Sequence, residues 1–205
     1  MLDTMKQAAE TAEPDAHIAR RVRRLRTDQS LSLEALAERS GVSRSMISLI
    51  ERGESSPTAN VLDRLAGALG VSLASLFAEE PRPDASPLAR RPDQPEWRDP
   101  ATGYVRRNLS APGHPSPLEL VEVVLPAGAR VTYDMAARAP AIEQQVWLIE
   151  GALEITVGDA AWRLEAGDCL TMRVDRPTAF HNPGARPSRH LVALTLGRAG
   201  YRSLA

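Results

Sequence analysis

Residues 32–52, SLEALAERSGVSRSMISLIER, constrain what this chain can fold into more than any other stretch. Apolar residues recur there at helical spacing in two short runs, Leu33, Leu36 and Ala37 followed by Val42, Ile47 and Ile50. Between the runs lies Gly41, and glycine adopts the left-handed conformation of a sharp turn without a steric penalty. Ser32 and Ser43 each precede a run, where a serine hydroxyl can cap a helix. The pattern predicts two short helices joined by a tight turn.

The outer face of the second predicted helix is polar, most of all near its N-terminus. In a helix-turn-helix, base-reading side chains occupy this place. We therefore predict DNA contacts from Ser43, Arg44, Ser45, Ser48 and Arg52. Arg44 can offer two donors to guanine O6 and N7, and short hydroxyls allow close approach to the groove. The alternative is a helical hairpin with a solvated outer face, but the caps, the glycine and the apolar positions together favour DNA binding.

A cluster of arginines precedes this motif, although the whole chain has a net charge of only −1. Its members are Arg20, Arg21, Arg23, Arg24 and Arg26. Such a run is often only a solvated face, but beside a recognition helix it can neutralise phosphates and release counterions. We add to the predicted DNA contacts two of these arginines and three serines, namely Arg23, Arg24, Ser32, Ser55 and Ser56. For the serines, a purely structural role in a cap or a turn is the alternative.

The run from residue 32 to residue 77 resembles the helix-turn-helix domain of the phage-repressor (Cro/C1, or XRE) family. The segment ISLIERGESSP, followed by an amphipathic helix and GVSLASLF, is characteristic of that family. The resemblance implies a DNA-binding domain. From the helical spacing we predict five helices within residues 15–79, the fourth over residues 58–69 and the fifth over residues 72–77. Residues 1–14 are polar and alanine-rich, and we predict a disordered leader there.

The composition changes after this domain. Residues 80–95 contain five prolines and few apolar residues, which indicates a semi-rigid linker. In residues 96–205, short apolar or alternating runs occur at 118–125, 145–149, 153–157, 170–174 and 190–196. Turns rich in glycine and proline separate these runs, which predicts an all-β sandwich or barrel. The expected fold class is α+β multidomain, with an all-α domain followed by an all-β domain.

The order of turns in the second domain resembles the cupin family, whose fold is a double-stranded β-helix or jelly-roll barrel. The segments LPAGARVTYD and QQVWLIEGALEITVGDAAWRLEAGDCLTMRVDRPTAFHNPG follow the two motifs of that family in order. In metal-binding members, the first motif supplies two histidines and a glutamate, and the second supplies a third histidine.

The family's four metal-ligand positions hold other residues here, Asp134, Ala136, Gln144 and Thr178. Only Asp134 keeps an ionisable oxygen, and Glu143 could replace Gln144 only if the strand register shifted by one residue. A metal with open coordination positions typically needs at least three good protein ligands. We therefore predict no metal site and no cofactor.

Such a barrel can still bind a small molecule. If Gln144 faces inward, strand alternation places Val146 and Leu148 on the same face, and Thr178 and Phe180 share a face in the same way. The predicted ligand pocket comprises Gln144, Val146, Leu148, Thr178 and Phe180, with Tyr133 or Asp134 at its rim. A filled barrel that serves only for dimerisation is the alternative. We expect Cys169, the only cysteine, to be buried.

These features together predict a DNA-binding transcription regulator, with repression as the expected action and no enzymatic activity. Its expected partners are a palindromic double-stranded DNA operator, a small-molecule effector and a second copy of the chain, with no membrane. The expected location is the cytoplasm, at the nucleoid. Two alternatives remain from other classes of protein. One is a cupin enzyme fused to a helix-turn-helix, like the hydroxyalkylphosphonate epoxidases, and the other is an antitoxin-type repressor that binds a protein partner.

Overall fold

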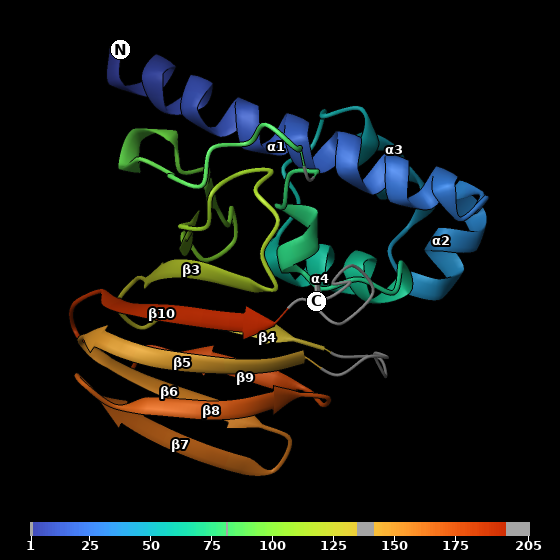
Figure 1. The fold of residues 1–205 in the computed structure, drawn as a ribbon. Coiled ribbons are helices and arrows are strands. Elements are labelled where there is room, and N and C mark those ends of the chain that lie inside the picture. The colour runs from blue at the N-terminus through green and yellow to red at the C-terminus, as the bar shows by residue number, and fades with distance from the viewer. Residues whose placement is uncertain (1, 81, 135–141, 196–205) are drawn as a thin grey trace, which may run out of the picture.

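The computed structural model describes residues 2–80, 82–134 and 142–195. Helices formed by the N-terminal half lie against one end of an antiparallel β barrel formed by the C-terminal half (Figure 1). None of the described helices is both long and apolar enough to cross a membrane.

The first helix, α1 (Leu2–Asp28), differs from the sequence-based prediction. We expected a disordered leader over residues 1–14 and a helix start near Asp15, whereas α1 is already helical from Leu2 and continues through Pro14. Residues 2–13 are rich in alanine, glutamate, glutamine, lysine and methionine, which favour helix, and this propensity outweighs their polarity. Further along, Ile18 and Val22 are fully buried and attach α1 to the core.

Three shorter helices follow, α2 (Leu33–Ser40), α3 (Arg44–Glu51) and α4 (Ala59–Ala68). The Ser32 hydroxyl accepts the Ala35 N–H at 3.1 Å, and the Ser43 hydroxyl accepts the Met46 N–H at 3.2 Å. Gly41 has φ 64°, the left-handed conformation that the turn between α2 and α3 requires. The predicted caps and turn are therefore confirmed.

The prediction of a fifth helix over residues 72–77 was wrong. The described residues form four α-helices, and within residues 72–77 they form only a 3₁₀ turn, η1 (Ala74–Leu76). Its hydrogen bonds are of the i→i+3 type, as in Phe77 N–H to Ala74 O at 3.0 Å. The Ser72 hydroxyl accepts the Ser75 N–H at 3.0 Å, so it replaces a backbone partner that a full helix would use.

The barrel consists of two antiparallel sheets with strand orders β1-β2-β3-β10-β5-β8 and β4-β9-β6-β7. Its strands are β1 (Glu96–Arg98), β2 (Val105–Asn108), β3 (Leu118–Leu125), β4 (Arg130–Tyr133), β5 (Ile142–Glu150), β6 (Ala152–Val157), β7 (Ala160–Glu165), β8 (Cys169–Val174), β9 (Thr178–His181) and β10 (Ser188–Thr195). The predicted runs correspond to β3, β5, β6, β8 and β10, although residue 196, at the end of the last run, lies outside the described residues.

Alternation along the strands separates the interior of the barrel from its surface. Val146 and Leu148 on β5 are fully buried, whereas Trp147 between them is 47% exposed. Cys169 pairs with Trp147 on the outer face and is exposed, so the prediction of a buried cysteine was wrong. Its position at the first residue of β8, opposite an outward-facing side chain, explains this exposure.

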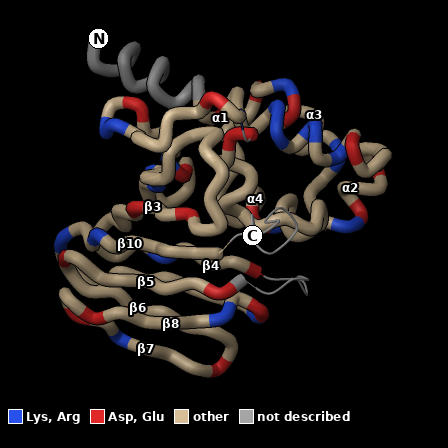
Figure 2. The backbone as a smooth tube through the Cα atoms, viewed as in Figure 1, with Lys and Arg blue, Asp and Glu red and all other residues tan. Residues whose placement is uncertain are grey.

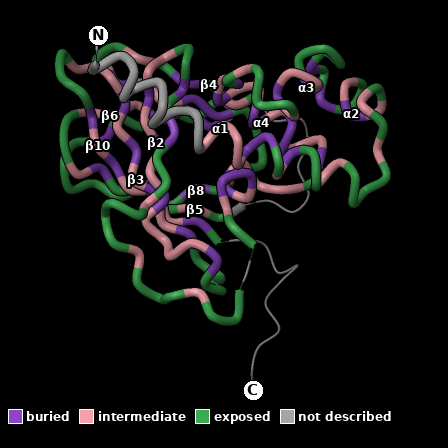
Figure 3. Tube along the Cα trace, turned by 90° about the horizontal axis from the view of Figure 1, so that it is seen from above, coloured by how far each residue is buried: buried purple, intermediate pink, exposed green. Residues whose placement is uncertain are grey.

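The helices and the barrel share one hydrophobic core. Trp97 of β1 packs between Phe77, which follows η1, and Tyr104, with ring centroids 5.5 and 5.8 Å away. The guanidinium of Arg106 on β2 lies 4.9 Å above the Phe77 ring. Buried residues accordingly run through both parts of the molecule (Figure 3). The proline-rich segment expected as a linker, which contains the short 3₁₀ turn η2 (Arg91–Asp93), therefore joins two parts that are packed together.

Candidate DNA interface and barrel cavity

The α2–α3 pair lies at the end of the molecule away from the barrel (Figures 1 and 3). Ile47 and Ile50 are buried and fix α3 on the helical core. As a result, Ser43, Arg44 and Ser45 at the start of α3 are exposed to solvent. Figure 2 shows basic positions gathered where α1 and α3 lie side by side. A face of this kind can enter a DNA groove.

Arg44 of α3 and Arg52, which directly follows α3, are paired with acidic groups on the same surface. Arg44 Nε lies 2.6 Å from a carboxylate oxygen of Glu34 on α2, and both side chains are 66% exposed. Arg52 forms an ion pair with Glu54 at 2.8 Å and also donates to the Ser48 hydroxyl. Hydrogen bonding to Arg52 holds the pKa of Glu54 below its usual range. Exposed pairs of this type add little stability, so DNA phosphates or base edges can replace these partners at small cost.

The arginines of α1 have different roles. Arg26 binds Glu51 of α3 through two hydrogen bonds of 2.6 and 2.8 Å in a largely buried pair, so it holds α1 against α3. Arg24 is exposed and pairs with Glu80 at 2.5 Å. Arg23 is exposed and has no ion pair with any residue that the structure describes. Of these three, Arg23 and Arg24 are the ones available to phosphate.

The three remaining predicted serines all have partners within the protein. Ser32 caps α2, as described above. The Ser56 hydroxyl donates to the Asp15 carboxylate at 2.6 Å, and the Ser55 hydroxyl lies 3.7 Å from the sulfur of Met46. These contacts give the serines a structural role, while Ser32 and Ser56 also stay exposed on the surface.

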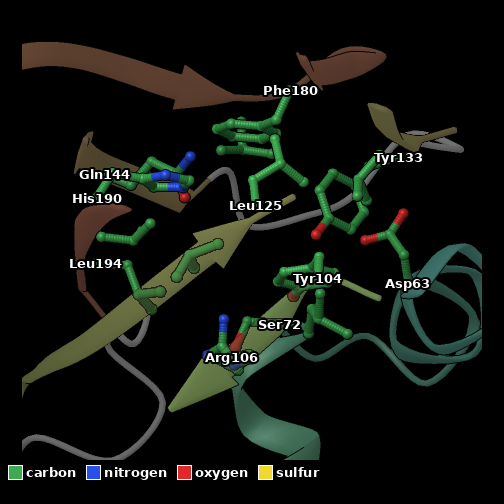
Figure 4. A pocket seen from close by; sticks show the side chains of 16 residues that line it. Asp63, Ser72, Tyr104, Arg106, Leu125, Tyr133, Gln144, Phe180, His190 and Leu194 are labelled. Atoms are coloured by element: carbon green, nitrogen blue, oxygen red, sulfur yellow. The ribbon is translucent and has the colours of Figure 1, made fainter. Parts of the chain in front are cut away.

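A cavity of about 90 Å³ lies between the barrel and the helices (Figure 4). Of the predicted pocket residues, Tyr133, Gln144 and Phe180 line it. The other four predicted residues do not line it. Val146 and Leu148 are buried elsewhere in the barrel. Thr178 is also buried, and its hydroxyl donates to Arg176 O, whereas Asp134 is exposed near Asn60. The structure therefore brings together only part of the predicted pocket.

Sequence reasoning missed most of the lining. From the barrel these residues include Tyr104, Arg106, His190, Val192 and Leu194, and from the helices Asp63, Ser72, Leu73 and Ala74. Alternation within β10 could have placed His190, Val192 and Leu194 inside. No local signal indicates that α4 and η1 close the barrel, because that follows from packing between distant segments.

His190 is the most unusual residue in the cavity wall. It is 2% exposed, and its ring stacks on Phe180 with 6.1 Å between centroids and 2° between planes. Its Nδ1 has no hydrogen-bond partner among the described residues. Burial lowers the pKa of His190 to about 4, so the imidazole is neutral at physiological pH.

The opposite end of the cavity is lined by hydroxyl and charged groups. In Figure 4 the side chains of Tyr133, Tyr104 and Asp63 converge there, with Arg106 below them. Burial raises the pKa of both tyrosines, most strongly that of Tyr133, so both hydroxyls stay protonated. Arg106 lies 3.5 Å from Glu119, whose pKa is also raised by burial.

The residues at the cupin family's metal positions do not fit a metal ion. Gln144 lines the cavity, Thr178 and Asp134 lie outside its lining, and Ala136 is outside the described residues. Over residues 2–80, 82–134 and 142–195, no group of three or more His, Cys, Asp or Glu side chains could hold a metal ion. His181 instead pairs with Glu154 at 3.0 Å.

Residues 22–76 match the family described as Helix-turn-helix (HTH_3). The matched segment contains the capped α2–α3 pair and the exposed start of α3. Residues 22–76 of this chain form a helix-turn-helix of the HTH_3 kind.

Relatives extend beyond the HTH_3 domain. The chain is 26% identical over 181 residues to the HTH-type transcriptional regulator PuuR of Escherichia coli K12, which covers 86% of this chain and 93% of PuuR. It is 27% identical over 164 residues to the HTH-type transcriptional regulator SutR of the same organism, and this match covers 80% of this chain and 85% of SutR. The crystal structure of an HTH_3 family transcriptional regulator from Vibrio cholerae has a TM-score of 0.69 at 23% identity, with 91% of this chain and 99% of that chain covered. The fold of the Vibrio cholerae regulator is thus shared along nearly the whole of this chain.

Proposed function

We propose that this protein is a sequence-specific DNA-binding transcription regulator in which α3 is the recognition helix. The observation that carries this proposal is the exposed, Ser43-capped start of α3 within a matched HTH_3 domain. Arg44 and Ser45 are free to approach base edges there, because Ile47 and Ile50 bury the other face. The similarity to PuuR and SutR along most of the chain supports a regulatory role for the protein as a whole.

We further propose the finer points of this function. One domain of this size reads few base pairs, so we infer a homodimer on a palindromic operator with half-sites one helical turn, about 34 Å, apart. Repression is the action we propose, at the nucleoid. For the barrel we propose effector sensing rather than catalysis, because its residues at the cupin family's metal positions do not fit a metal and a cavity lies between the barrel and the helices.

Selection of genomic DNA fragments with the purified full-length protein, followed by footprinting, tests the DNA-binding function. We expect one enriched sequence with two symmetric protected half-sites. Replacement of Arg23 by alanine should weaken binding to all sequences and reduce the salt dependence of affinity, because a phosphate contact releases a counterion. Equal binding of random and selected fragments would contradict the proposal.

A further inference from the structure

The cavity is lined by both parts of the molecule. Asp63 on α4 and Ala74 in η1 belong to its helical wall, while Tyr133, Phe180 and His190 belong to its barrel wall (Figure 4). A molecule inside would therefore touch the helix-turn-helix domain and the barrel at once.

Direct hydrogen bonds already hold α4 to the barrel close to this cavity. The Ala59 N–H at the start of α4 donates to the buried carboxylate of Asp99 at 2.9 Å. The Asn60 side chain donates to Thr132 O and to the Asp134 carboxylate, each at 3.2 Å. Asp63 lies about one helical turn further along the same helix. An occupant of the cavity would therefore contact α4, the helix that these hydrogen bonds attach to the barrel.

His190 is one of the polar residues that an occupant of the cavity would meet. Figure 4 shows His190 and Gln144 beside each other, at the end of the cavity opposite Asp63. The Nδ1 of His190 is buried and has no hydrogen-bond partner among the described residues, and the neutral ring offers one donor and one acceptor. A buried polar atom without a partner is costly, so an occupant that hydrogen-bonds to it gains affinity.

The charges around the cavity disfavour an anion. Arg106 is the one lysine or arginine among the described lining residues, and it is already engaged by Glu119 and by the Phe77 ring. The Asp63 carboxylate adds negative charge at the same end. At the His190 end, no described lining residue carries a charge that could neutralise an ion. Burial of an unpaired charge is far more costly than burial of a neutral polar group.

The size of the cavity limits the occupant further. A volume of about 90 Å³ is smaller than the roughly 150 Å³ of an apolar cavity that admits benzene. We propose that this cavity binds a small uncharged molecule with a short apolar part and a hydrogen-bonding group, and that the bound molecule bridges α4 and the barrel. This proposal rests on the proposed sensing function, for which it names the ligand class and the route to the DNA-binding domain.

Three probes of nearly equal shape test the ligand class, namely propionamide, propionate and propionamidinium. Chemical shifts of the full-length protein are followed by NMR during titration with each probe. We expect saturable shifts with propionamide and at least about tenfold weaker binding of the two ions. The hydrogen-bonding end of each probe would lie beside His190, where no described lining residue carries a counter-charge, whereas Asp63 and Arg106 lie at the opposite end of the cavity. No saturable binding of propionamide, or equal or tighter binding of an ion, would overturn the proposal.

Variants locate the site. His190→Phe keeps the aromatic stack but removes the nitrogen, and should reduce propionamide affinity at least about tenfold, whereas His114→Phe at an exposed histidine should not. If His190→Phe does not fold, Leu194→Phe fills the cavity and should give the same loss. Unchanged affinity in the folded cavity variant would exclude this site.

Hydrogen exchange tests the bridge. Bound propionamide should slow amide exchange in both α4 and β10, and protection confined to β10 would show that the molecule does not bridge the two parts. DNA binding of the same samples is measured without the probe. Failure to bind specific DNA would count against the proposed regulator, whereas failure to bind propionamide would count against the cavity proposal.

Discussion

In the proposed regulator, single side chains of α3 determine how tightly it binds its operator. Among the residues that the structure describes, the ion-pair partner of Arg44 is Glu34, and this pair is exposed, so the guanidinium can exchange this partner for a base edge. We predict that Arg44→Ala weakens binding to the selected operator by about 1–3 kcal/mol and relaxes preference at one base pair. Titration of labelled operator variants measures both effects.

The control for this prediction is Arg163→Ala, which removes an exposed arginine on β7, in the barrel. Its affinity for the operator should stay close to that of the wild type. If Arg44→Ala binds the operator as tightly as this control does, Arg44 does not contribute to base reading.

His190 should make stability depend on pH. Its pKa is lowered to about 4 in the folded protein, while the unfolded chain has a pKa near 6.5. The unfolded state therefore binds the proton first, so the stabilisation by neutral His190 is complete above about pH 6.5 and falls as the pH drops toward 4. The loss is on the order of 3 kcal/mol over this range. Urea unfolding of the wild type and of His190→Phe should show a shallower pH dependence in the variant, and parallel curves would contradict this prediction.

Among the elements, α4 depends on a residue of the barrel. Asp99 is almost fully buried, accepts the Ala59 N–H and also accepts the N–H and hydroxyl of Thr102, at 2.9 and 2.5 Å. Its carboxylate lies at the N-terminus of α4, where a negative charge is favourable.

We predict that Asp99→Ala lowers the free energy of unfolding by about 2–3 kcal/mol, because it leaves buried N–H groups without a partner. Thermal and urea unfolding measure this loss. The matched control is Asp84→Ala at an exposed aspartate, which should change stability by less than about 0.5 kcal/mol. Equal stability of the two variants would show that Asp99 does not hold α4.

The elements also show what local sequence can and cannot predict. The signals for α2 and α3 are local: Ser32, Ser43 and Gly41 lie within a few residues of the helices they cap or terminate. The strand β7 was missed because Leu164 is its one buried side chain, so it shows no alternation. The cavity was predicted only in part, since Asp63 and Ala74 come from segments whose contact with the barrel depends on tertiary packing.

For the whole molecule, we predict that the purified protein contains no stoichiometric iron, zinc or nickel. Gln144 and Thr178 replace metal-binding side chains of the resembled cupins, and the described residues form no alternative cluster. Elemental analysis by mass spectrometry of protein purified without chelators measures the content. One tightly held metal per chain would contradict the prediction and the proposed use of the cavity.

The shared core of Phe77, Trp97 and Tyr104 has a consequence for how the protein would choose its operators. A DNA-binding domain on a flexible linker tolerates variable spacing between half-sites, because the linker lets the domain shift to each position. A DNA-binding domain that is packed against its barrel, in contrast, moves together with the barrel. In a dimer of such units, one inserted base pair would rotate the second half-site by about a tenth of a turn relative to the protein. The rotational phase of the two half-sites would then contribute to discrimination among genomic sites, in addition to their base sequence.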